Sequence, residues 1–194
     1  MRQVTVKLIP KLGLSSLTLT MMILILASCG GSKDKTQLDT RAVPPYALTS
    51  MAFESERPIP DVYTCSGQNV SPQLAWSIAP HGTKTFALIM IDPDAKEFTH
   101  WILFNLSSNI NYLPEAASPR GQLPAGTLEG NNGFGKIGYG GPCPPSGRLH
   151  RYQFTLYALG HSLALETGAS REQVLEAMQG DVLATWQLTG TYRK

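Results

Sequence analysis

Hydrophobic residues fall in short runs between clusters of glycine and proline along most of this chain. Residues 85–91 and 101–106 are continuous apolar runs of strand length, which is typical of strands buried on both faces. Residues 151–158 alternate instead, so Tyr152 and Phe154 share one face. Several short strands with glycine and proline turns predict a mainly β domain, an antiparallel β-sandwich or a barrel.

One segment near the C-terminus has a helical period. Ser170 is a good N-cap, and Gln173 stands where a capping box requires it. Val174 and Met178 follow at helical spacing, and Gly180 ends the pattern. The sequence therefore predicts one short helix packed on a β body.

The first residues have the pattern of a targeting signal: a basic start, a short apolar run and small residues before a cysteine. The apolar run is shorter than the roughly 20 residues that span a bilayer, and Ser and Thr dilute it. Residues 26–29, LASC, resemble a bacterial lipobox, in which the cysteine becomes the lipidated N-terminus. We expect residues 1–28 to be a lipoprotein signal peptide and Cys29 to carry the lipid. A plain signal peptide or a membrane anchor is the alternative.

Residues 29–45 are polar, lack apolar periodicity and end in two prolines, so they predict a flexible tether before a domain at 46–194. The expected location is the bacterial cell envelope. If the cell is Gram-negative, this means the outer membrane facing the periplasm, because Gly30 rather than Asp follows the cysteine.

Charge argues against nucleic acid as a partner. The formal net charge is +2, but three of the 16 basic residues lie before position 29, where no acidic residue occurs. The remainder is close to neutral and has no basic cluster.

Two cysteines, Cys65 and Cys143, remain once Cys29 is set aside as a lipid site. An even pair outside the cytosol is consistent with a disulfide. Two partly buried free thiols are the alternative. Neither cysteine has a C-x-x-C partner, so a metal site is not expected.

Residues 133–138 match the pattern G-x-G-x-x-G letter for letter. A dinucleotide site requires a strand before the glycines and a helix after them. Polar turn residues precede this stretch, and glycine and proline follow it. We therefore interpret it as a glycine-rich connection and expect no cofactor.

Candidate chemistry lies where predicted strands meet loops, at Asp92, His100, His150 and Tyr152. Period 2 places His150 and Tyr152 on one face. Each residue alone also has a structural explanation, such as capping a turn or packing in the core. Together, two imidazoles, a phenol and a carboxylate could hold an anion such as phosphate, with the carboxylate orienting an imidazole or binding an amine.

Three stretches, DPDAKEFTHWILFN, GYGGPCPPSGRLHRYQFTLYAL and GASREQVLEAMQGDVLATWQLTGTY, resemble the bacterial branch of the phosphatidylethanolamine-binding protein family, also called Raf kinase inhibitor-like proteins. The resemblance runs from about Phe53 to Tyr192. It implies a β-sandwich with a small anion pocket near one end. By motif position, the resemblance implies these ligand-binding residues: Asp92, His100, Gly141, Pro142, His150 and Tyr152.

Three classes of function follow. We favour a membrane-anchored binding protein for phosphate-bearing small molecules or phospholipid head groups. The second is an inhibitor or scaffold of a partner protein, a protease or a kinase. The third is a weak hydrolase, although no serine, cysteine or metal site stands beside a base, and no G-x-S-x-G motif occurs.

Overall fold

The computed structural model describes residues 47–194. The signal peptide predicted at 1–28, Cys29 and the tether up to residue 45 therefore lie outside the described residues. The elements are, in chain order, β1 (Leu48–Thr49), β2 (Arg57–Pro58), η1 (Asp61–Tyr63), β3 (Leu74–Trp76), β4 (Thr85–Asp92), η2 (Pro93–Ala95), β5 (Phe98–Ser107), β6 (Tyr112–Leu113), β7 (Leu128–Glu129), β8 (Leu149–Leu159), α1 (Arg171–Ala177) and β9 (Val182–Arg193).

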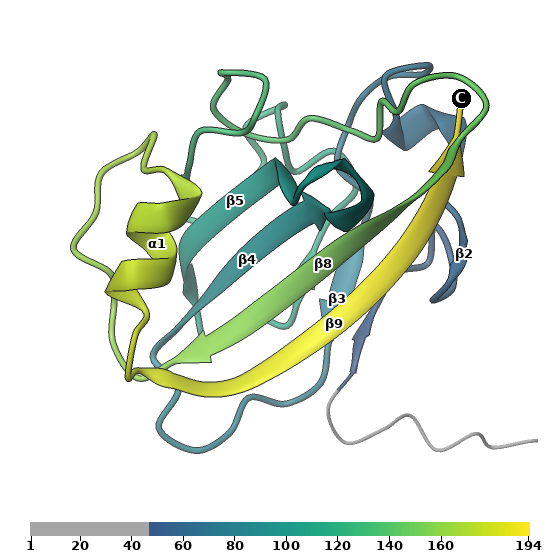
Figure 1. The fold of residues 1–194 in the computed structure, drawn as a ribbon. Coiled ribbons are helices and arrows are strands. Elements are labelled where there is room, and N and C mark those ends of the chain that lie inside the picture. Colours follow the sequence, from purple (N-terminus) through teal and green to yellow (C-terminus); the bar gives the residue numbers. More distant parts are fainter. Residues whose placement is uncertain (1–46) are drawn as a thin grey trace, which may run out of the picture. The chain divides into compact units, whose positions relative to one another are not determined.

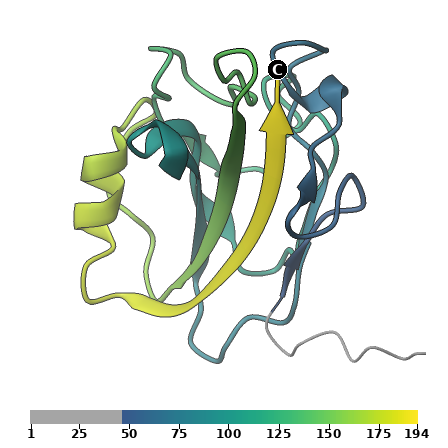
Figure 2. The same cartoon turned by 45° about the vertical axis from the view of Figure 1, so that its right-hand side comes forward.

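Two sheets form the body of the domain. The larger has six strands in the order β2-β9-β8-β4-β5-β7, and the smaller has three in the order β1-β3-β6. All pairings are antiparallel except that between β2 and β9. Figure 2 shows the large sheet between α1 on one side and, on the other, the blue segment with which the described residues begin. The prediction of a mainly β sandwich with one short helix is confirmed.

The large sheet is buried on both faces because its central strands are apolar at consecutive positions. In β4, Phe86, Leu88 and Met90 belong to the core shared with the small sheet, whereas Ala87 and Ile89 belong to a second core that includes α1. This explains why the sequence of β4 is a continuous apolar run rather than an alternating one.

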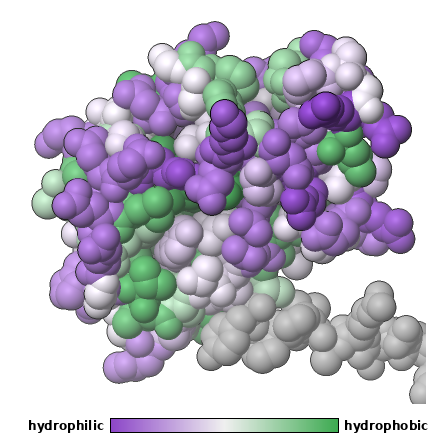
Figure 3. Space-filling model, in the orientation of Figure 1, coloured by the Kyte–Doolittle hydropathy of each residue, from purple (hydrophilic) through white to green (hydrophobic). Residues whose placement is uncertain are grey.

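The helix α1 begins as its sequence predicts. The Ser170 hydroxyl accepts from the Gln173 amide, and the Gln173 side chain accepts from the Ser170 amide, which completes a capping box. Within residues 47–194, no helix has the length and apolar character needed to cross a bilayer. On the face shown in Figure 3, apolar side chains gather in separate groups among polar ones.

Candidate functional site

The antiparallel register of three central strands brings the predicted site residues together. β4 ends at Asp92, and β5 and β8 both begin beside that end. His100 lies near the start of β5 and His150 near the start of β8. η2 and the loop that leads into β8 lie at the same end of the sheet, near the C-terminus (Figure 1). Asp92, His100 and His150 all line one cavity there.

The Asp92 carboxylate is buried, with 2% of the residue exposed, and its oxygens accept three hydrogen bonds. One oxygen accepts from the backbone amides of Asp94 and Ala95, at 2.9 and 3.1 Å, and so caps η2. The other accepts from Nδ1 of His150 at 2.7 Å. These bonds compensate the carboxylate for the loss of water and fix the orientation of the His150 ring.

His100 is held in the same manner by a different acceptor. Its Nδ1 lies 2.7 Å from the carbonyl oxygen of Gly140. A carbonyl can only accept, so Nδ1 carries the proton. Burial is the main influence on this ring and lowers the pKa of His100. The neutral imidazole, with its proton on Nδ1, is therefore the favoured form.

Tyr152 lies behind the cavity wall rather than in it. Its ring is fully buried and packs edge-on against His100, with centroids 5.1 Å apart. Its hydroxyl makes no hydrogen bond of good geometry with a described residue. Burial, followed by the neighbouring Asp92 carboxylate, raises the pKa of Tyr152. A direct ligand contact by Tyr152 stays a prediction, because the hydroxyl is not part of the lining.

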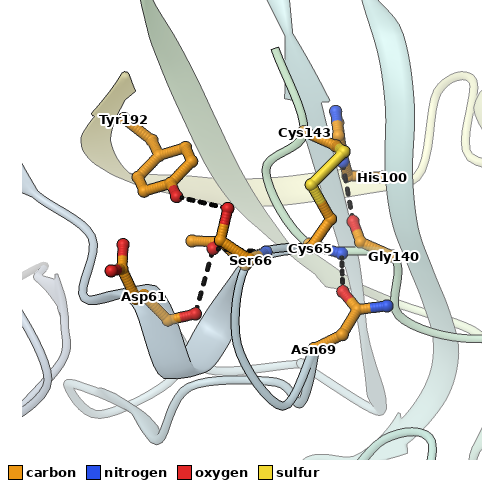
Figure 4. Close-up of a disulfide and its surroundings, with 10 residues drawn as sticks. Asp61, Cys65, Ser66, Asn69, His100, Gly140, Cys143 and Tyr192 are labelled. Atoms are coloured by element: carbon orange, nitrogen blue, oxygen red, sulfur yellow. Dashed lines mark hydrogen bonds between the residues drawn. A yellow bond between two sulfur atoms is a disulfide. The ribbon is translucent and has the colours of Figure 1, made fainter. Parts of the chain in front are cut away.

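Gly141 and Pro142 anchor the loop that forms one wall. The Gly141 amide donates to the Asn69 side chain at 2.7 Å, and the Pro142 carbonyl accepts from the Cys65 amide at 3.0 Å. A disulfide between Cys65 and Cys143 joins the same two segments of the chain. Figure 4 shows this disulfide next to His100. Ligand contacts by Gly141 and Pro142 also stay predictions, because the first residue of this loop that lines the cavity is Cys143.

The cavity has a volume of about 160 Å³, which is small beside the roughly 300–1,000 Å³ of pockets for drug-sized ligands. This volume suits an inorganic ion or a head group, and a longer ligand would have to extend out of the cavity. The walls combine polar strand ends with apolar loop residues: Asp92, Ala95, Phe98, His100, Phe134, Cys143, Pro144, Pro145 and His150.

Sequence reasoning missed the aromatic part of this wall. Phe98 and Phe134 pack edge to face, with centroids 4.8 Å apart, and both contact the His100 ring. Phe98 could have been found, because it lies two residues before His100 on the same strand and period 2 places both on one face. Phe134 comes from the glycine-rich segment at 133–138, where no local signal connects it to the cavity.

The chemistry of the walls favours binding over catalysis. The Asp92–His150 pair could act as a base, but no serine, threonine or free thiol is among the lining residues. In residues 47–194, no group of three or more His, Cys, Asp or Glu side chains is arranged to hold a metal ion.

Comparisons with known proteins agree with this architecture. The sequence model of one family, phosphatidylethanolamine-binding protein, matches residues 49–193. A UPF0098 protein of Methanothermobacter thermautotrophicus is 50% identical over 149 residues, which cover 76% of this chain and 98% of the relative.

Two solved structures are similar as well. One is a phosphatidylethanolamine-binding protein homologue from Chlamydia trachomatis, 42% identical, with a TM-score of 0.72 over 78% of this chain and 99% of that one. The other is Escherichia coli YbcL, 33% identical, with a TM-score of 0.73 over 77% of this chain and 99% of that one. The chain belongs to the phosphatidylethanolamine-binding protein family.

Proposed function

We propose that the protein binds the phosphoryl group of a small molecule or of a phospholipid head group in the cavity at the end of the large sheet. The observation that carries the proposal is the meeting of Asp92, His100 and His150 in one small cavity. The family's name, which refers to phosphatidylethanolamine, supports the same class of ligand.

The rigidity of the site supports binding too. His150 is fixed by Asp92, and His100 by the Gly140 carbonyl, so neither ring has to be ordered when a ligand enters. Less conformational entropy is then lost on binding, which favours affinity for a small ligand. The cavity volume favours a head group or a free anion over a whole lipid.

We also propose that the domain acts next to a bilayer, through lipid attached to Cys29. The support is the LASC motif after a basic and apolar start. A head-group ligand and a soluble phosphate ester are then both within reach in the cell envelope.

Calorimetric titration of the full chain with phosphate and with phosphoethanolamine tests the proposal. His100→Ala and His150→Ala should each lose about tenfold to hundredfold in affinity, because each removes a hydrogen bond to a charged ligand. His161→Ala is the matched control: this histidine is exposed, pairs with Asp181 and does not line the cavity. Its affinity should equal that of wild type.

Two results would change the interpretation. If both cavity variants stay folded and bind within about twofold of wild type, a difference well under 1 kcal/mol, the site assignment is wrong and a protein partner becomes the leading function. If phosphate esters are hydrolysed by wild type but not by His150→Ala, the hydrolase class takes its place.

A further inference from the structure

We propose that an aromatic wall, formed by Phe98 and Phe134, makes the cavity selective for phosphate-bearing ligands that also carry a cationic ammonium group. This inference rests on the proposed function and adds the residues that choose the ligand. In this arrangement the phosphoryl group lies inward, against His100 and His150, and the ammonium group lies at the cavity mouth, against Phe134.

Phe134 lies at the mouth of the cavity. It is one of the lining residues, yet 46% of the residue is exposed. Its ring packs edge to face with two neighbours, with centroids 4.8 Å from Phe98 and 5.5 Å from His100. A phenyl ring that stays half in water gives up part of the free energy that burial in the core provides. The position of Phe134 therefore favours contact with a bound ligand.

Two glycines make room for the aromatic wall. A β-carbon on Gly133 would lie 2.5 Å from the ring of Phe98, and a β-carbon on Gly140 would lie 2.6 Å from the ring of Phe134. Both distances are far shorter than van der Waals contact, so neither ring could keep its place beside a larger residue. The glycine-rich segment at 133–138 thus has a structural role next to the cavity.

A buried amide holds the backbone that carries Phe134. The side-chain oxygen of Asn132 accepts from the backbone amide of Phe134 at 2.9 Å, and its NH₂ group donates to the Gly138 carbonyl at 2.8 Å. The Gly133 amide donates to the Thr99 carbonyl on β5 at 2.7 Å, which ties this segment to the sheet. Little backbone entropy therefore remains to be lost when a ligand contacts the ring.

The charge of the cavity favours a ligand that brings its own cation. No lysine or arginine is among the lining residues. Asp92 accepts three hydrogen bonds as a carboxylate, so the Asp92–His150 pair is neutral at most, whatever the protonation state of His150. Burial lowers the pKa of His100, which disfavours a positive charge on that ring. An ammonium group on the ligand compensates its phosphate charge where the walls supply no net positive charge.

The aromatic wall is the surface that suits this ammonium group. The face of an aromatic ring attracts a cation that lies within about 6 Å of its centroid, and quaternary ammonium groups are commonly recognised in this way. The Asp92 carboxylate is already engaged by His150 and by two backbone amides of η2. The ligand class is therefore a phosphate ester of an amino alcohol such as ethanolamine or choline.

The first measurement compares two phosphate esters of the same shape on the full wild-type chain. Phosphocholine carries the cation, and its tert-butyl isostere has carbon in place of the charged nitrogen. Phosphocholine should bind about threefold to tenfold more tightly, the effect of one cation–π contact at a partly exposed site. Equal affinities would overturn the inference and leave the proposed function intact. If neither ester binds and inorganic phosphate does not bind either, the proposed function itself fails.

The second measurement repeats both titrations with Phe134→Leu, which removes the ring and keeps an apolar side chain. The phosphocholine affinity should fall to that of the isostere, and the isostere affinity should change by less than about twofold. An equal loss for both esters would mean that the ring provides only apolar contact, and would overturn the inference. If Phe134→Leu does not fold, the two wild-type affinities decide.

Tyr112→Leu is the matched control. Tyr112 is an aromatic residue of similar exposure, 48%, but it lies in β6 of the small sheet and does not line the cavity. Both affinities should equal those of wild type. A loss of phosphocholine affinity as large as in Phe134→Leu would show that the effect is not specific to the aromatic wall, and would overturn the inference.

The ester decides whether the ligand comes from a lipid. Phosphocholine is a soluble monoester, whereas glycerophosphocholine is the diester head group of a phospholipid without its acyl chains. Both carry the ammonium group, so Phe134→Leu should weaken both by the same factor, and the ester that wild type binds more tightly identifies the source. If the more tightly bound ester loses no affinity in Phe134→Leu, the inference is wrong.

Discussion

Removal of the disulfide between Cys65 and Cys143 should destabilise the protein strongly without displacing the cavity wall. The bond links residues 78 positions apart. In the chain-entropy model a loop of this length removes about 4.5 kcal/mol of denatured-state freedom. For a domain of this size each kcal/mol corresponds to about 2–4 °C in Tm, so we expect a decrease of about 9–18 °C.

The native wall has other support. The Cys65 amide still donates to the Pro142 carbonyl, and the Gly141 amide to Asn69. The free energy should therefore be lost mainly through the denatured state, and the phosphate affinity of the folded variant should change little.

The assay is urea unfolding of wild type and of a Cys65→Ser, Cys143→Ser variant, with Tm measured in parallel. Both cysteines are exposed, so reduction of wild type by a thiol should reproduce the effect. A larger m-value in the variant would report a more expanded denatured state. A loss of less than about 1 kcal/mol would refute the reasoning, because it lies below the usual range for native disulfides.

Three further predictions concern other parts of the chain. Cys29→Ala should leave the precursor unprocessed or release the protein from membranes, as fractionation would show; a mature N-terminus elsewhere by mass spectrometry would contradict the lipid site. Gly141→Ala should cost about 2 kcal/mol or more in urea unfolding, because a β-carbon would collide with the Tyr63 carbonyl; wild-type stability would argue against this packing. Replacing Pro144 and Pro145 by Ala should weaken phosphate binding by freeing the turn before β8, and unchanged affinity would remove the turn from the mechanism.

Much of the fold can be predicted from the sequence, because the local hydrophobic patterns agree with the burial of the same residues in the structure. The alternation in 151–158 puts Tyr152 and Phe154 on one face, and both are fully buried in the core between the sheets. The parallel pairing of β2 with β9 could not be predicted. β2 is two residues long, and its partner lies more than a hundred residues away.

The site was predictable only where its residues sit at strand ends. Asp92, His100 and His150 mark the ends of apolar or alternating runs, and antiparallel pairing brings such ends together. Loop residues show no periodic pattern of apolar and polar positions. The sequence therefore could not show that Phe134 lines the cavity or that Gly141 does not. Those placements depend on long-range contacts.

The position of His150, where a loop becomes a strand, is explained by how firmly both sides of that junction are held. At its start β8 pairs with β9, where His150 lies opposite Tyr192, and from Gln153 onward it also pairs with β4. The disulfide ties the preceding loop to residue 65. Nδ1 of each cavity ring makes a hydrogen bond of 2.7 Å, in His100 to the Gly140 carbonyl and in His150 to the Asp92 carboxylate. Both imidazoles are therefore held in place where they line the cavity. Side chains that are fixed before a ligand enters favour binding, because little conformational entropy remains to be lost.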